Sequence, residues 1–356
     1  MSRLPESRTP DHTPSRRRAL GAIGVASVLL LAAVVVGGAV GAVALPFGQV
    51  VRTLLDQLPG VTVDGGLGPV DTRILLDIRL PRVILGALVG GLLASAGAAY
   101  QGVFRNPLAD PYLLGAAAGA GLGATLVLVA APAASIGPLG PLPVAAFTGA
   151  LVGVGLAYAL GSAAARAGGG GAALVLAGVA VTAFLTAGQT FVLQANTESL
   201  QRVYGFILGR LSGAGWGEVL LVLPYAVVST VVLQLAARRL DVLAVGDDEA
   251  TSLGVRPERV RLVVLLAASL ATAAAVAVSG LIGFVGLVVP HVMRRLAGPG
   301  HAVLLPVCLL GGGAFVVLAD VVARTALAPA ELPLGVVTAF VGAPFFALLL
   351  ARGPRG

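Results

Sequence analysis

The chain has 356 residues, of which 57% are hydrophobic and only 11% are charged. Because about one quarter of the residues in a soluble domain are charged, this composition excludes an ordinary water-soluble protein and indicates an integral membrane protein. The net charge of +7 rests on arginine, with no lysine in the chain, and we attribute it to the base composition of the genome rather than to a nucleic-acid partner. A nucleotide-binding P-loop needs a lysine, so the chain has no ATPase site of that type.

Ten apolar stretches follow one another along the chain. A helix rises about 1.5 Å per residue, so about 20 apolar residues cross the roughly 30 Å hydrocarbon core of a bilayer. The stretches cover residues 19–45, 83–104, 112–131, 142–163, 172–194, 219–237, 262–280, 281–296, 303–323 and 334–351. The sequence therefore predicts an all-α integral membrane protein of about ten transmembrane helices.

The first stretch follows Arg16, Arg17 and Arg18 and is too long for the apolar region of a signal peptide. It predicts a retained signal anchor behind a disordered cytoplasmic tail over residues 1–18, with the membrane domain over residues 19–356. Arginines are more numerous in the loops on the side of the amino terminus, and basic loops stay in the cytoplasm. Both termini are therefore predicted to be cytoplasmic.

Glycines shape the packing that we expect in the membrane. Several recur at intervals of four, which puts small residues on one helical face and favours close helix contacts. These sets are Gly37 and Gly41, Gly86 and Gly90, Gly115, Gly119 and Gly123, and Gly149 and Gly153. In the eighth and shortest stretch, Gly280, Gly283, Gly286 and Pro290 predict a kinked or partial crossing.

The long charged loop on the inner side, residues 239–258, has the pattern of a short helix. Asp247 suits the N-cap, and the two acidic residues after it complement the positive end of the helix dipole. Gly254 suits a left-handed terminator, and Pro257 suits the start of the next helix. The spacing alone leaves two interpretations equal, a helix that docks on a partner or a solvated connector.

Another inner loop, residues 105–111, brackets a polar turn between two prolines, and its Asn106 either lines a gate or satisfies loop backbone groups. On the outer side, Arg79 and Arg82 open the second stretch, and Arg324 follows Asp320 by one turn. Outer arginines either reach the membrane interface or form a patch for an acidic partner. The i,i+4 spacing predicts that Asp320 pairs with Arg324 rather than carrying protons.

Metal and enzyme signatures are weak. His12, His291 and His301 each lack a second ligand at helical spacing, so no metal site is expected. No H-E-x-x-H or G-x-S-x-G motif occurs, which disfavours an intramembrane protease. A proton-coupled secondary transporter would need acidic or histidine residues facing a cavity near the middle of the membrane, and few candidates exist. That class stays as a distant alternative.

Five strings from about residue 70 to the end resemble, in consistent order, the permeases of iron-siderophore, haem and vitamin B12 importers. They are Arg79–Arg82, Gln101–Gly115, Gly246–Arg261, Gly280–His291, and Leu318–Arg324 with Glu331–Gly335. The resemblance implies a type II ABC importer, in which two ten-helix permeases form a central pathway above two cytoplasmic ATPase subunits. A separate extracytoplasmic binding protein delivers the ligand. The second permease is either an identical copy or a related chain, and the location implied is the cytoplasmic membrane of a bacterium.

The resemblance also implies roles for individual residues. The ATPase-coupling element would be Asp247, Asp248, Glu249, Ala250, Thr251, Ser252, Leu253 and Gly254. The binding protein would dock on Arg79, Arg82 and Arg324. Asn106 and Leu108 match the inner gate, and the fifth stretch, Leu174–Gln194, would line the pathway. The chain departs from the vitamin B12 permease at Gly168–Gly171 and Ala172, where hydroxyl residues are absent and no gate residue can be assigned.

The expected function is therefore that of a permease without catalytic residues or bound cofactor, with ATP hydrolysed by its partners. An iron siderophore is the first choice of ligand because that role is commonest among such permeases. Cobalamin is the second choice and haem the third.

Overall fold

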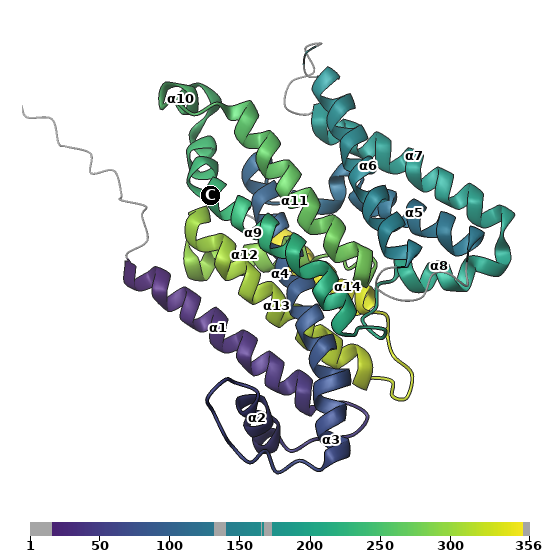
Figure 1. Ribbon diagram of the computed structural model, residues 1–356. Helices are drawn as coiled ribbons and strands as arrows, with labels where there is room; N and C mark the ends of the chain where they lie inside the picture. The colour runs from purple at the N-terminus through teal and green to yellow at the C-terminus, as the bar shows by residue number, and fades with distance from the viewer. Residues whose placement is uncertain (1–15, 132–139, 165, 167–172, 352–356) are drawn as a thin grey trace, which may run out of the picture.

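The computed structural model describes residues 16–131, 140–164, 166 and 173–351, and these form a bundle of helices (Figure 1). The long helices are α1 (Arg16–Ala39), α4 (Leu80–Phe104), α5 (Ala116–Ala130), α6 (Pro141–Ala164), α7 (Ala173–Ala195), α9 (Trp216–Val245), α11 (Pro257–Ser279), α12 (Val285–Ala297), α13 (His301–Thr325) and α14 (Leu334–Ala351). The short ones are α2 (Phe47–Asp56), α3 (Pro69–Arg73), α8 (Leu200–Ile207) and α10 (Asp247–Ser252). A π-helical segment, Ile74–Arg79, leads into α4, and 3₁₀ turns cover Pro111–Leu114 and Thr197–Ser199.

The predicted all-α membrane architecture is confirmed, since each of the ten predicted stretches coincides with a helix. Within the described residues, seven helical segments are long and apolar enough to cross a membrane, and α5 and α14 are shorter apolar helices. The eighth stretch, α12, has 13 residues. Its start is set by the backbone between Gly280 and Phe284, which have positive φ angles of 68° and 67°. Pro290 lies inside α12 without ending it, so the partial crossing arises at the glycine end of the stretch.

The ends of the first helix differ from the prediction. Helix α1 already begins at Arg16, so Arg16, Arg17 and Arg18 are helical rather than part of a tail. It ends at Ala39, earlier than the predicted residue 45. Residues 1–15, for which disorder is predicted, lie outside the described residues.

Close backbone approaches at glycine hold the bundle together, as the four-residue spacing predicts. On α5 and α6, a Cβ at Gly119 would overlap the carbonyl oxygen of Gly149, and a Cβ at Gly149 would overlap that of Gly119. The same reciprocal contact joins Gly90 on α4 to Gly312 on α13. Such contacts let backbones meet where lipid offers no hydrophobic driving force between helices. The helices differ in burial: most of the segment that contains α4 is buried inside the bundle, whereas most of α1 is exposed at its periphery.

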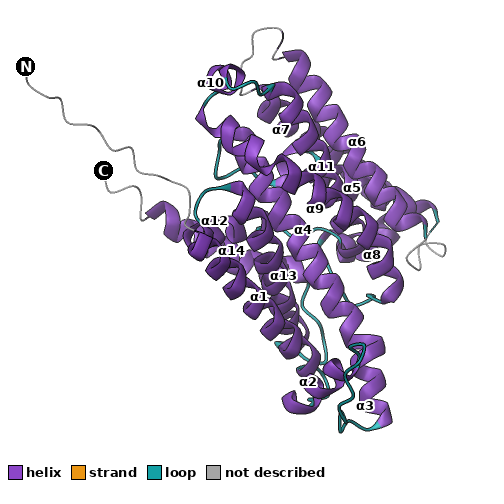
Figure 2. Ribbon diagram, turned by 60° about the vertical axis from the view of Figure 1, so that its left-hand side comes forward, coloured by secondary structure: helices purple, strands orange, loops and turns teal. Residues whose placement is uncertain are grey.

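The two ends of the bundle carry different elements. Helix α10 lies at one end, and α2 and α3 lie at the opposite end (Figures 1 and 2). The sequence-based topology assigns the α10 end to the cytoplasm. We call these the α10 end and the α2–α3 end.

Candidate coupling and docking sites

Helix α10 forms where the charged inner loop predicts it, with one difference at its start. Gly246 is the N-cap, and Asp247 is the first helical residue rather than the cap. The predicted terminator is confirmed, because Gly254 follows the helix with a φ of 77°. Pro257 occupies the first turn of α11, as expected from its fixed φ and missing N–H. Both ends of this projecting segment are thus set by local sequence.

Asp247 ties α10 to two long helices. One carboxylate oxygen, Oδ1, accepts hydrogen bonds from Arg105, at the end of α4, and from Arg261 on α11, the latter at 2.7 Å. The hydrogen bond from Arg261, followed by the charges of both arginines, lowers the pKa of Asp247. Arg105 also donates from Nε to the carbonyl oxygen of Leu243 on α9 at 2.7 Å. Asp247 and Arg105 therefore link α10 to α4, α9 and α11.

The other residues of the predicted coupling element divide into one buried and several exposed positions. Ala250 is fully buried and belongs to the main hydrophobic core. The side chains of Asp248, Glu249 and Leu253 face away from the bundle and are exposed. Thr251 and Ser252 donate to carbonyl oxygens within the helix. The exposed side of α10 presents two carboxylates and one large apolar group.

The predicted gate residues lie in an exposed loop at the α10 end. The side-chain oxygen of Asn106 accepts a hydrogen bond from the backbone N–H of Leu108 at 2.9 Å, which forms an Asx turn. Leu108 is exposed. This geometry matches the local backbone role that the sequence leaves open for Asn106, and the gate role of both residues stays a prediction. Gly168–Gly171 and Ala172 lie outside the described residues.

At the α2–α3 end, Arg79 is buried and donates hydrogen bonds to the carboxyl end of α1. Its guanidinium donates to the carbonyl oxygens of Gly38, at 2.8 Å, and Ala39, at 3.0 Å, and also to that of Val43. Arg324 donates from Nη2 to the carbonyl oxygen of Gly37 at 2.7 Å. The last carbonyls of a helix have no partner within the helix, and cations are favourable there. Two of the three predicted docking arginines therefore cap the carboxyl end of α1.

The third arginine, Arg82, joins two acidic residues. It forms an ion pair with Asp320 on α13 at 2.8 Å and one with Glu331 at 2.8 Å. The side chain of Asp320 is 3% exposed, whereas that of Glu331 is 39% exposed. The hydrogen bond from Arg82 lowers the pKa of Glu331. The predicted pairing of Asp320 with Arg324 is present at 3.6 Å, but Arg82 is the nearer partner.

Sequence spacing missed two pairs because their members are far apart in the chain. Arg82 and Asp320 are separated by 238 residues. His301, which seemed isolated, has Nδ1 at 2.6 Å from Oδ1 of Asp241, 60 residues away. Nothing within one helix signals either pair. Among the described residues, no group of three or more His, Cys, Asp or Glu lies close enough to hold a metal ion.

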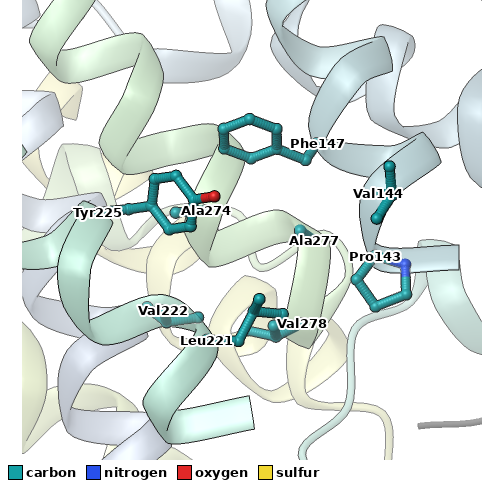
Figure 3. A pocket seen from close by; sticks show the side chains of 9 residues that line it. All are labelled: Pro143, Val144, Phe147, Leu221, Val222, Tyr225, Ala274, Ala277 and Val278. Carbon is teal, nitrogen blue, oxygen red and sulfur yellow. The ribbon is translucent and has the colours of Figure 1, made fainter. Parts of the chain in front are cut away.

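An apolar cavity of about 140 Å³ lies between α6, α9 and α11. Figure 3 shows apolar side chains around it and the Tyr225 hydroxyl as its polar group. The rings of Phe147 and Tyr225 lie 5.2 Å apart between their centroids. The lining residues are Pro143, Val144, Phe147, Leu221, Val222, Tyr225, Ala274, Ala277 and Val278. Within the described part of the chain, this lining contains no charged residue. The charged residues that the sequence singles out lie instead at the α10 end and the α2–α3 end of the bundle.

Comparisons with known proteins agree on one class. Residues 24–352 match the FecCD transport family. The chain is 44% identical to the cobalamin import system permease BtuC of Halobacterium salinarum, over 77% of this chain and 72% of the relative. It is 41% identical to the hemin transport system permease HmuU of Yersinia pestis, over 79% and 84%, and 34% identical to the Fe(3+)-citrate import system permease YfmE of Bacillus subtilis, over 95% and 97%. A solved chain of an inward-facing metal-chelate type ABC transporter superposes with a TM-score of 0.78 at 28% identity, over 93% of this chain and 98% of that one.

Proposed function

The chain belongs to the FecCD transport family, and from this premise we propose that it carries an iron-siderophore complex across the cytoplasmic membrane of a bacterium. As a member of that family, it is a multi-pass permease subunit of an ABC importer and not an enzyme in itself. Such permeases work with ATPase subunits and with a binding protein. The membership favours ATP-driven import over proton-coupled transport.

Helix α10 is the observation that carries the proposed mechanism. An ATPase subunit that closes on ATP would press on the exposed side of α10, and Asp247 would pass this movement to α4 through Arg105 and to α11 through Arg261. The two arginines reach the same carboxylate oxygen from different helices, so the three elements move together. Alternating access then follows from a shift between two packings of the bundle.

The test compares two carboxylates at the α10 end of the assembled importer. Asp247→Asn removes the charge that joins α10 to α4 and α11, whereas Glu258→Gln removes an exposed charge from the first turn of α11, outside the coupling element. We expect Asp247→Asn to lower the cargo imported per ATP hydrolysed, with much less change for Glu258→Gln. Equal effects of the two variants on this ratio would contradict transmission through Asp247.

We also propose that the binding protein docks at the α2–α3 end through Arg82. An acidic side chain of that protein would replace Glu331 as the outer partner of Arg82, while Arg79 and Arg324 contribute positive charge from beneath. Glu331→Gln should therefore strengthen docking by freeing Arg82, and the gain should shrink with added salt. If Glu331→Gln instead weakened docking, the binding protein would be recognising Glu331 itself rather than Arg82.

The most specific part of the proposal is the identity of the imported ligand. The Fe(3+)-citrate permease, which matches over 95% of this chain, supports an iron chelate, and the cobalamin and hemin permeases correspond to the two alternative cargoes. Two copies of the permease would enclose the pathway, and α7 exposes Phe184 and Phe191 for contact outside the chain. Uptake into vesicles that contain the complete importer should be measured with ferric siderophores, cobalamin and haem. Import of cobalamin alone would overturn the proposed cargo while leaving the mechanism intact.

A further inference from the structure

A basic cavity of about 540 Å³ opens at the α10 end of the bundle. It lies between the carboxyl ends of α4, α9 and α12 and the amino end of α13. Its charged and titratable lining residues are Arg105, Arg294, Arg295, His291 and His301. Among the described residues, no carboxylate belongs to its lining.

Two of its arginines are not neutralised. Arg105 is paired with Asp247. Arg294, in contrast, donates to the neutral side-chain oxygen of Gln101. Arg295 lies 3.4 Å from His291, between Nη2 and Nε2. Among the ion pairs of the described residues, none includes Arg294 or Arg295, so the cavity carries excess positive charge.

A buried nitrogen in the same lining lacks a partner. His301 is 6% exposed, and its Nδ1 and backbone N–H both lie against Oδ1 of Asp241, at 2.6 and 2.8 Å. Its Nε2 is buried without a hydrogen-bond partner in the described part of the chain. Buried polar atoms normally have a partner. This nitrogen packs against Gly102 of α4, so the His301 ring forms part of the polar wall of the cavity.

The cavity also lies near the lipid-facing edge of the bundle. Arg18, near the start of α1, donates to the carbonyl oxygen of Arg295 at 3.5 Å. Helix α1 is peripheral and exposes Leu20, Val28 and Leu31, as expected of a helix against acyl chains. Arg295 therefore lies beside the start of α1, which the sequence-based topology places at the cytoplasmic surface of the membrane, where lipid headgroups lie. Basic pockets between membrane helices on the cytoplasmic side bind such headgroups.

We propose that this cavity is a binding site for the phosphate group of an anionic phospholipid of the inner leaflet. Arg294 and Arg295 hold the phosphate. The site shares Arg105 with the coupling contact and Asn106 with the predicted gate, but Arg294 and Arg295, which carry the proposal, belong to neither, and the site does not depend on the identity of the cargo.

A second basic cavity supplies a matched control. It has a volume of about 350 Å³ and is lined by Arg239, Arg256 and Arg259. It also lies at the α10 end of the bundle. Within the described residues, its lining contains no buried side chain without a hydrogen-bond partner. Removing two arginines there changes the net charge by the same amount.

The experiment counts phosphatidylglycerol retained by the complete importer, by native mass spectrometry after transfer from phosphatidylglycerol-containing vesicles into detergent. Each arginine near an anionic headgroup is expected to contribute about fivefold to affinity, so Arg294→Gln with Arg295→Gln should lower it by about twenty-fivefold. Glutamine at position 294 retains an amide that can donate to Gln101. Arg239→Gln with Arg259→Gln should leave retention unchanged. Equal retention by wild type and the 294/295 variant would overturn the proposal, as would an equal loss in the control.

Three further measurements distinguish a lipid in this cavity from free phosphate and from a protein partner. Arg295→Gln alone changes an exposed side chain, so it tests the site even when the double variant does not fold, and it should lower retention about fivefold. Millimolar inorganic phosphate should not displace the lipid; displacement would assign the site to free phosphate. A 294/295 variant that loses the ATPase subunit but keeps its phosphatidylglycerol would assign the cavity to an acidic protein partner and refute the lipid site.

Discussion

Arg82 on α4 and Asp320 on α13 form an ion pair of 2.8 Å across 238 residues of sequence. The pair is buried at the α2–α3 end, where Arg324 lies against the other oxygen of the same carboxylate at 3.6 Å. One acidic residue therefore balances charge from two helices. Its loss would take the carboxylate from Arg324 and leave Arg82 with the more exposed Glu331 alone.

Asp320→Asn should strongly destabilise the protein. Breaking a buried ion pair from one side costs about 3–5 kcal/mol because the remaining charge is left unpaired. Glu331→Gln removes the exposed partner of the same arginine and should cost less than about 1 kcal/mol. Thermal unfolding in detergent measures both. A smaller shift of the midpoint for Asp320→Asn than for Glu331→Gln would show that burial does not set the strength of this cluster.

Arg79→Met should release the carboxyl end of α1. The substitution keeps a long apolar side chain but removes the donors to Gly38 and Ala39. Hydrogen exchange at the last turn of α1 and the residues after it should increase, and the unfolding midpoint should fall. Arg73→Met, at an exposed position of the same end, should change neither. Unaltered exchange in Arg79→Met would refute the capping role.

Gly149→Ala should be destabilising, whereas Gly155→Ala on the same helix should be neutral or slightly stabilising. A Cβ at Gly149 would overlap the backbone of α5, but a Cβ at Gly155 meets nothing within 4 Å. Overpacking typically costs about 1–3 kcal/mol, while alanine is a better helix former than glycine by up to about 1 kcal/mol. The difference in unfolding midpoint between the two variants is the measurement. Equal unfolding midpoints for the two variants would mean that α5 and α6 can move apart to accommodate the added methyl group without a loss of stability.

The tether of α10 should be insensitive to pH across the physiological range. The pKa of Asp247 is lowered by its arginine partners, so its contribution is present above the pKa of the unfolded chain and is lost only as pH falls through the lower folded value. Hydrogen exchange of residues 247–254, corrected for intrinsic rates, should therefore show the same protection at about pH 6 and about pH 8. Asp247→Asn should lower protection at both values. A loss of protection in the wild type between these values would contradict a lowered pKa.

Local patterns in the sequence predict much of this structure. Apolar stretches locate the helices, glycines at intervals of four locate several close backbone contacts such as Gly119 with Gly149, and Gly254 and Pro257 mark the end of α10 and the start of α11. These features depend on neighbours within a few residues. The pairing of Arg82 with Asp320 and the capping of α1 by Arg79 depend on which helices meet, which a single sequence without contacts does not specify.

One of the donors that complete the end of α1 comes late in synthesis. Gly37 receives its hydrogen bond from Arg324, 287 residues further along the chain, whereas the neighbouring carbonyls depend on Arg79, about 40 residues away. When α1 first enters the bilayer, Arg324 has not been translated. The first helix must therefore wait in the lipid, with its outer end unfinished, until nearly the whole polypeptide has been inserted and α13 arrives beside it.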